Sequence, residues 1–139
     1  MNAYEKATSL IKIRPHFSGE LAKKLSLRGF SKLDIEKVIN QLTEEGLLDD
    51  SQFAQIYLDN LIKYKTFGFY GLKAKLMQRG IANSDAEVLL KEKLSMKDEK
   101  KIAERFLEKE KEPNKLKLAQ KLSRKGFRTE IISSFLQDV

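Results

Sequence analysis

Residues 21–30 of the chain read LAKKLSLRGF, and closely related stretches read LKAKLMQRGI at 72–81 and LAQKLSRKGF at 118–127. All three follow the formula L-x-x-K-L-x-x-[RK]-G-[FI], and their glycines, at positions 29, 80 and 126, lie 51 and 46 residues apart. A pattern that recurs at a nearly constant period is typical of a repeat protein, in which each copy forms the same small unit. The sequence therefore predicts three copies of one unit.

Each copy has the features of an α-helix that ends at a glycine. The residue just beyond a helix end often adopts the left-handed conformation, which glycine reaches without steric cost. Such an ending brings the residue four positions before the glycine against the residue that follows it, here Leu25 against Phe30. A fourth stretch, around position 46, fits the same rule. We therefore expect helices to end at Gly29, Gly46, Gly80 and Gly126.

Apolar residues recur at helical spacing along the chain, and no stretch shows the alternation of a β-strand. We therefore predict an all-α fold of three tandem three-helix repeats, with nine helices and no sheet. The predicted repeats are 1–48, 49–94 and 95–139. A unit of about 46 residues buries little apolar surface by itself, so either neighbouring units should pack against one another or the chain should need a partner to become fully ordered. The Lys- and Glu-rich stretch 97–112 should be a solvated helix face.

Polar residues that commonly cap helices precede several of the predicted helices. Ser18, Ser31 and Asp50 stand where N-caps are expected, and Ser84 with Glu87 has the spacing of a capping box. These positions predict where the helices begin.

The composition indicates a globular protein with an anionic partner. Of the 139 residues 41% are hydrophobic and 34% charged, and 27 Lys and Arg against 20 Asp and Glu give a formal charge of +7. That excess fits a modest contact with nucleic acid or with an acidic protein groove. The absence of cysteine excludes disulfides and thiolate metal sites. Because no apolar run is long enough to span a membrane and no signal-peptide pattern is present, we expect a cytoplasmic protein.

Few residues are typical of a catalytic site. His16, the one histidine, lies beside Pro15 and Phe17 in a predicted turn, where it would fill the turn rather than act as a general base. Asp49 and Asp50 could bind Mg²⁺, but capping and the helix dipole also explain an acidic pair at a helix start. The sequence contains no glycine-rich nucleotide-binding loop. We therefore expect a protein that is not an enzyme, with no cofactor and no catalytic or metal-binding residue.

Two basic residues stand four positions apart in each copy of the repeat, so each pair shares one face of a helix. The helix dipole stabilises a cation near the C-terminus, which would explain any single pair as a local feature of a helix end. Three such pairs in one chain equally fit a surface that follows an anionic partner. The candidate partner- and DNA-binding residues are Lys24, Arg28, Lys75, Arg79, Lys121 and Lys125.

The segment 63–73 contains the densest mixture of aromatic and basic side chains. Exposed rings flanked by lysines could stack on the bases of a single-stranded nucleic acid. The alternative is that the rings belong to the core and pack at a bend between units. The rings are those of Tyr64, Phe67, Phe69 and Tyr70, and the lysines are Lys63, Lys65 and Lys73.

Several of these stretches together match one known family. They are residues 18–30, residues 46–57 with the sequence GLLDDSQFAQIY, Gly68, and the helix endings at 76–81 and 122–127. On these residues the chain resembles the RecX family, regulators of the RecA recombinase, over essentially its whole length. The resemblance implies tandem three-helix repeats. The chain departs from the family pattern at 68–71, where Gly-Pro is frequent, and at Lys75, where an acidic residue is usual.

The resemblance implies a non-enzymatic protein that lies in the groove of the RecA–DNA filament and contacts successive protomers. Such a protein restrains ATP hydrolysis, strand exchange and co-protease activity in DNA recombination, DNA repair and the SOS response. The implied partners are the RecA filament and, weakly, DNA that is single-stranded or within the filament. The protein is expected to be a monomer that does not contact a membrane. An alternative is an autonomous helical DNA-binding protein that acts without RecA, because tri-helical units resemble helix-turn-helix modules.

Overall fold

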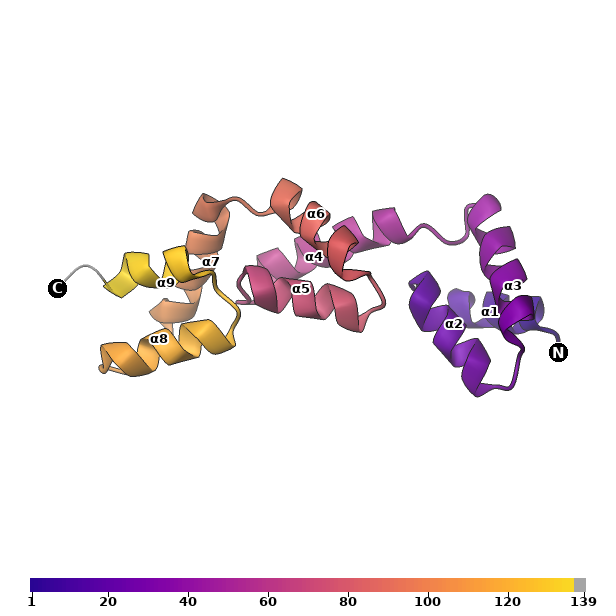
Figure 1. The fold of residues 1–139 in the computed structure, drawn as a ribbon, viewed down its shortest axis with the longest axis horizontal. Coiled ribbons are helices and arrows are strands. Elements are labelled where there is room, and N and C mark those ends of the chain that lie inside the picture. The colour runs from indigo at the N-terminus through magenta and orange to yellow at the C-terminus, as the bar shows by residue number, and fades with distance from the viewer. Residues whose placement is uncertain (137–139) are drawn as a thin grey trace. The chain divides into compact units, whose positions relative to one another are not determined.

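The structure is a computed structural model and describes residues 1–136. These residues contain nine α-helices and no strand. Short connections join them (Figure 1). The helices are α1 Ala3–Ile13, α2 Ser18–Leu27, α3 Lys32–Glu44, α4 Asp50–Tyr64, α5 Phe69–Gln78, α6 Asn83–Lys93, α7 Met96–Glu108, α8 Lys115–Arg124 and α9 Thr129–Leu136. The prediction of an all-α fold with three tandem groups of three helices is confirmed for these residues.

The three glycines of the repeated pattern, and Gly46, follow helix ends in the left-handed conformation. The backbone angle φ is 89° at Gly29, 76° at Gly46, 99° at Gly80 and 84° at Gly126. After α2 the Phe30 N–H donates a hydrogen bond of 3.3 Å to the Leu25 carbonyl, which is the bond that characterises this type of ending. Equivalent bonds of 2.9 and 3.2 Å close α3 and α8. The left-handed glycine is therefore common to all three copies of the repeated sequence.

The helix starts agree less well with the sequence pattern. Ser31 caps α3 as predicted, because its hydroxyl oxygen accepts a 3.1 Å hydrogen bond from a backbone N–H of the first turn. The predicted capping box of Ser84 and Glu87 is wrong. Helix α6 begins at Asn83 without a side-chain cap, so Ser84 lies inside the helix. Glu87 instead forms a 2.7 Å ion pair with Lys73 of α5.

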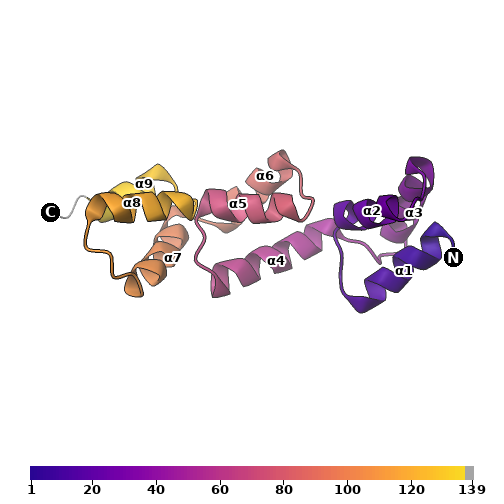
Figure 2. The same ribbon diagram turned by 90° about the horizontal axis from the view of Figure 1, so that it is seen from below.

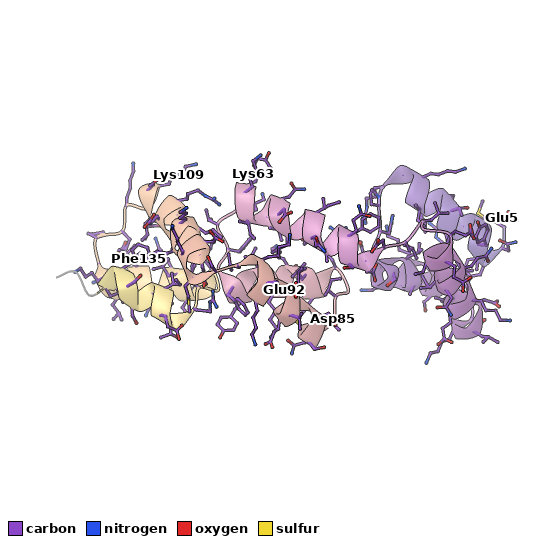
Figure 3. The ribbon with its side chains drawn as sticks, turned by 90° about the horizontal axis from the view of Figure 1, so that it is seen from above. Glu5, Lys63, Asp85, Glu92, Lys109 and Phe135 are labelled. Atoms are coloured by element: carbon purple, nitrogen blue, oxygen red, sulfur yellow. The ribbon has the colours of Figure 1, made fainter. Side chains whose placement is uncertain are left out.

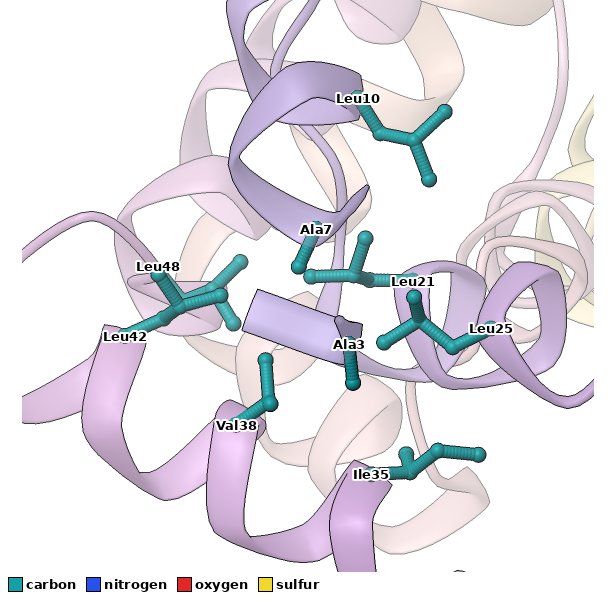
Figure 4. Close-up of a cluster of buried hydrophobic side chains, with 9 residues drawn as sticks. All are labelled: Ala3, Ala7, Leu10, Leu21, Leu25, Ile35, Val38, Leu42 and Leu48. Atoms are coloured by element: carbon teal, nitrogen blue, oxygen red, sulfur yellow. The ribbon is translucent and has the colours of Figure 1, made fainter. Parts of the chain in front are cut away.

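The first of two compact units comprises residues 1–55 and 78–81. Its core lies among α1, α2 and α3, each of which contacts the other two. Apolar residues spaced three and four apart give each helix one buried face. Figure 4 shows the resulting cluster of Ala3, Ala7, Leu10, Leu21, Leu25, Ile35, Val38, Leu42 and Leu48.

The second compact unit comprises residues 56–77 and the described residues from 82 onward. In its C-terminal part α9 contacts both α7 and α8 (Figures 1 and 2). Buried core residues of this unit include Leu58, Leu72, Leu90, Ile102 and Leu122. The compact units thus do not coincide with the predicted repeats 1–48, 49–94 and 95–139, which stay a prediction about the repeating element. The last three residues of the third repeat lie outside the described residues.

Candidate functional site

The first basic residue of each repeated pair interacts with the connection before its own helix. Side chains of an α-helix tilt toward its N-terminus, which brings these lysines back over the preceding connection. Lys75 Nζ lies 5.1 Å from the ring centroid of Phe67, just before α5. Lys121 Nζ forms a 2.8 Å ion pair with Glu110, before α8. Both lysines therefore stabilise a turn of their own repeat.

Lys24 does the same through the buried ring of His16, which is 2% exposed. Burial lowers the pKa of His16 and outweighs the opposite effect of its bond to the Arg14 carbonyl. In the neutral ring Nδ1 donates to that carbonyl at 2.8 Å, and Nε2 accepts a 2.8 Å bond from Lys24 Nζ. Both ring nitrogens therefore hold the turn between α1 and α2, which agrees with the interpretation of His16 as part of a turn.

The second basic residue of the pair interacts with the preceding repeat in two of the three copies. In the first unit Arg79 Cζ lies 5.2 Å from the ring centroid of Phe17, and Arg79 Nη2 forms a 2.9 Å ion pair with Glu20. In the second unit Lys125 Nζ lies 4.3 Å from the ring centroid of Phe67. Because Phe17 and Phe67 both stand just before the middle helix of a repeat, the two contacts are equivalent.

Glycines allow the backbones to meet at these two contacts, each of which we term a joint. A joint is the contact between the start of the middle helix of one repeat and the glycine turn of the next. At the first joint a Cβ added to Gly19 would lie 3.2 Å from Gly80 Cα. At the second joint two backbone N–H groups at the start of α5 donate to the carbonyls of Lys125 and Gly126, at 2.9 and 2.8 Å. Repeats are therefore joined by backbone contact as well as by side chains.

Arg28 differs from the other five candidate residues. It belongs to the first of the three repeats, and among the described residues it makes no contact like those of Arg79 and Lys125. Its side chain is exposed and, within residues 1–136, its guanidinium forms no hydrogen bond or ion pair. The structure therefore brings Lys75 and Lys125 together on one ring, gives structural contacts to five candidates, and leaves Arg28 available to a partner.

Glu20 is the charged centre of the first joint. Its carboxylate accepts hydrogen bonds from Arg79 Nη2 at 2.9 Å, from Arg14 Nη2 at 3.1 Å and from the Phe17 N–H at 3.1 Å. Burial opposes ionisation of Glu20, but the bonds from Arg79, Phe17 and Arg14 outweigh burial and lower the pKa of the carboxyl group to about 2. The ionised carboxylate therefore stabilises the folded state.

We expect the first unit to lose stability between pH 4.5 and about 2 because of Glu20. Its pKa is lower in the folded than in the unfolded chain, so the stabilisation is complete above the ordinary value of 4.5 and is lost as protonation proceeds. A shift of this size corresponds to roughly 3 kcal/mol as an upper bound. Circular dichroism melting at a series of pH values measures it. Glu20→Gln should melt lower at neutral pH with a flatter pH profile, whereas Glu36→Gln, which changes an exposed residue of α3, should keep the wild-type profile.

Glu99 of α7, which sequence reasoning missed, stabilises the second joint from a fully buried position. Its Oε2 accepts hydrogen bonds from the N–H groups of Phe69 at 2.9 Å and Arg128 at 3.0 Å, and its Oε1 accepts a 2.5 Å bond from Arg128 Nε. The predicted solvated face at 97–112 is therefore wrong at this position. The available signal was spacing, because Glu99 precedes the buried residues Ile102 and Ala103 by three and four positions.

A groove of about 700 Å³ lies in the second unit between the end of α4, the connection 65–68, α7 and α8. We term it the cationic groove and define it by Tyr64, Lys65, Phe67, Phe106, Lys109 and Lys125. Figure 3 shows Lys63 at the end of α4 and Lys109 at the end of α7. Arg105 holds the connection in place, because its Nη2 donates a 2.8 Å bond to the Ile62 carbonyl and a second bond to the Lys65 carbonyl.

The rings of the segment 63–73 divide between the two sequence-based interpretations. Phe69 is buried in the core, at 4% exposure. Phe67 is half-buried beneath two lysines. Tyr64 and Tyr70 are exposed, at 68% and 56%. Core packing thus explains Phe69. Tyr64, by contrast, lines the groove and has an exposed ring on which a ligand could stack.

Asp49 and Asp50 both bind helix starts. Asp49 Oδ1 accepts a 3.1 Å bond from the Gln52 N–H and so caps α4, the role predicted for Asp50. Asp50 instead reaches α2, where its Oδ1 accepts a 2.8 Å bond from the Ser18 N–H and its Oδ2 accepts a bond from the Ser18 hydroxyl. The predicted N-cap role of Ser18 is wrong, because Phe17 occupies the N-cap position and Ser18 is the first residue of α2.

Among residues 1–136 no group of three His, Cys, Asp or Glu side chains could hold a metal ion. Helices with the length and apolarity needed to cross a bilayer are likewise not found there.

Comparisons with known proteins find relatives along the whole chain. A family model described as RecX, first three-helix domain, matches residues 3–42. The regulatory protein RecX of Prosthecochloris aestuarii is 32% identical over 140 residues, which cover 99% of this chain and 93% of that protein. The regulatory protein RecX of Pseudomonas fluorescens is 33% identical over 140 residues, or 94% of this chain and 86% of that protein. The crystal structure of RecX from Lactobacillus salivarius has the same fold, with a TM-score of 0.81 at 22% identity over 98% of this chain and 93% of that one.

Proposed function

The chain belongs to the RecX family, and from that premise we propose that it is a non-enzymatic regulator that binds the RecA–DNA filament. It would inhibit the ATP hydrolysis, strand exchange and co-protease activity of RecA. The observation that carries the proposal is similarity over 99% of the chain to a protein named as regulatory protein RecX. The partners would be the RecA filament and, weakly, its DNA, and the protein would act as a cytoplasmic monomer.

The repeated architecture supports binding to a filament. The three middle helices share one sequence formula, and each carries a glycine turn with positive φ at its end. The predicted repeats 1–48, 49–94 and 95–139 can therefore offer related surfaces to partner subunits that themselves recur. Several weak contacts on one chain reinforce one another, because each bound contact raises the effective concentration of the next.

Charge supports an anionic partner. The formal charge is +7, and Arg28 and the cationic groove carry part of the excess on exposed or half-buried side chains. Complementary charge speeds association, and this effect weakens as salt screens it.

Titration of the protein into RecA, single-stranded DNA and ATP tests the proposal. Hydrolysis should fall at substoichiometric or near-equal ratios to RecA. A folded sample that leaves both hydrolysis and strand exchange unchanged at every ratio would refute the proposal. A sequence-specific shift of duplex DNA in the absence of RecA would favour the autonomous DNA-binding alternative.

We expect Arg28→Glu to raise the concentration needed for half-maximal inhibition of RecA by about tenfold, which corresponds to about 1.4 kcal/mol of binding free energy. The exposed guanidinium has no hydrogen bond or ion pair in the described residues, so the substitution should cost the fold only the small contribution of the helix dipole, about 0.3–1 kcal/mol. Lys37→Glu, at an exposed position of α3, is the matched control for the change in net charge. Equal effects of the two variants would show that Arg28 makes no particular contact.

A further inference from the structure

The cationic groove is lined by segments that are distant in sequence, among them the connection 65–68, α7 and the end of α8. Lys125 lines it with its Nζ 4.3 Å from the ring centroid of Phe67, and Lys75 of α5 stands beside the groove, with its Nζ 5.1 Å from the same centroid. Phe106 of α7 adds a second ring, 5.7 Å from Lys125 Nζ. The second joint, which binds the start of α5 to the turn after α8, places these two lysines on one ring.

Among residues 1–136, the three lysines Lys65, Lys75 and Lys125 outnumber the one carboxylate at the groove, Glu108, that is not in an ion pair. Burial lowers the pKa of Lys125, and the charges of Lys75 and Lys65 lower it further. Within residues 1–136 none of these three lysines forms an ion pair. Two carboxylates also line the groove, but Glu110 is paired with Lys121 at 2.8 Å and Glu108 is exposed. An anion placed among the three lysines would therefore relieve their mutual repulsion.

An exposed aromatic ring accompanies this charge. Tyr64 lines the groove and is 68% exposed, and Lys63 Nζ lies 5.2 Å from its ring centroid. A ring and a phosphate-binding cation side by side match the alternation of base and phosphate along a nucleic acid strand. An acidic peptide would use the charge but not the ring, and the bases of a duplex are stacked on one another and cannot reach it.

We propose that the cationic groove binds a short stretch of single-stranded nucleic acid, with phosphates against Lys65, Lys75 and Lys125 and one base stacked on Tyr64. The inference rests on the proposed function for its role, since it supplies the DNA contact of a filament regulator. The binding itself requires no recombinase and is measured without one.

Fluorescence anisotropy with a labelled short oligothymidine tests the charge contribution. Lys65→Glu changes an exposed lysine in the groove, and Lys37→Glu makes the same change of charge on an exposed lysine of α3. We expect Lys65→Glu to weaken binding roughly tenfold relative to Lys37→Glu. The slope of log K against log salt should become shallower by about 0.7 for each phosphate that the groove no longer neutralises.

A second pair of variants tests stacking. Tyr64→Ala should weaken binding of the oligothymidine by roughly 5- to 100-fold at any salt concentration, because it removes the ring, and Tyr64→Phe should retain the affinity. Because Tyr64 is exposed, its replacement should not disturb the fold, so a loss of binding would not be due to misfolding. Circular dichroism spectra of all variants check this point.

Three results would overturn the inference. The first is no binding of oligothymidine by the wild-type protein. The second is equal binding by the Lys65→Glu and Lys37→Glu proteins, which would indicate diffuse attraction. The third is competition by polyglutamate as effective as that by unlabelled oligothymidine, which would assign the groove to an acidic protein. RecA inhibition is assayed separately. A protein that binds oligothymidine in the groove but does not inhibit RecA would refute only the proposed function. A protein that inhibits RecA but does not bind oligothymidine in the groove would refute only the groove proposal.

Discussion

Gly126→Ala is expected to destabilise the second unit by about 2–5 kcal/mol or more. Two independent effects add at this position. The backbone angle φ is 84°, a conformation that costs a residue with a Cβ about 1–2 kcal/mol. An added Cβ would also lie 2.0 Å from Gly71 N and 2.6 Å from Gly71 Cα, both backbone atoms that cannot move aside cheaply. Overpacking of this kind adds roughly 1–3 kcal/mol or more.

The other glycines separate the two effects. Gly29 has a φ of 89° and no atom within 4 Å of an added Cβ, so Gly29→Ala should cost only the conformational part, about 1 kcal/mol. Gly68 is not among the residues with positive φ, but its Cβ would lie 2.3 Å from Phe127 Cα, so Gly68→Ala should cost only the steric part. Gly80→Ala should fall between Gly29→Ala and Gly126→Ala, because its Cβ would lie 3.2 Å from Gly19 Cα.

Urea unfolding followed by circular dichroism measures the series. The expected order of stability is Gly29→Ala above Gly80→Ala above Gly126→Ala. If Gly126→Ala were as mild as Gly29→Ala, the second joint would not hold α5 and α8 at backbone contact.

The same glycine series shows which features of the fold the sequence reveals. A helix ending is local, since it depends on a glycine and on apolar residues four positions before it and one after it, so all four endings could be placed from the sequence. The joints are not local. Gly29, Gly80 and Gly126 obey one formula, yet only the last two pack against another repeat. The formula does not record what precedes a repeat in the chain.

The basic pairs illustrate the same limit on side chains. Four-residue spacing predicts that Lys75 and Arg79 share one face of a helix, and in the structure Lys75 lies in the last turn of α5 and Arg79 directly follows its end at Gln78. Their partners come from elsewhere, because Lys75 lies over Phe67 whereas Arg79 binds Glu20. No spacing rule connects positions 20 and 79. The sequence therefore cannot tell which of these cations contact another repeat and which are exposed to solvent, and only the structure shows it.

Helix starts were predicted poorly for a related physical reason. A capping residue competes with other acceptors and donors that tertiary structure brings near. Asp50 could have capped α4, but the start of α2 lies within reach and Asp50 accepts its bonds from Ser18, leaving the cap to Asp49. The choice between two adjacent aspartates depended on a helix more than thirty residues away.

Glu99→Gln is expected to destabilise the second unit by about 3–5 kcal/mol, the range found when one member of a buried ion pair is removed. The carboxylate accepts three hydrogen bonds with two oxygens. A glutamine presents one oxygen and one amino group, so at least one buried donor would face another donor. The guanidinium of Arg128 would also lose its counter-charge in a position where its side chain is only 18% exposed.

Glu104→Gln is the matched control, because Glu104 lies exposed on the same helix and the substitution removes the same charge. It should change the free energy of unfolding by less than about 0.5 kcal/mol. An equally small change for Glu99→Gln would contradict the buried position of the carboxylate.

The combination of Glu99→Gln with Arg128→Gln distinguishes loss of the ion pair from loss of the backbone bonds. If the unpaired guanidinium causes most of the damage, removing it should restore part of the stability, and the double variant should be more stable than the sum of the single effects predicts. If the bonds to the Phe69 and Arg128 N–H groups dominate, the two effects should add. Hydrogen exchange gives a local measurement, because the Phe69 and Arg128 amides lie at the starts of helices and are bonded to Glu99. The Glu99→Gln substitution should speed exchange at these two amides more than it speeds exchange at the amides of α1.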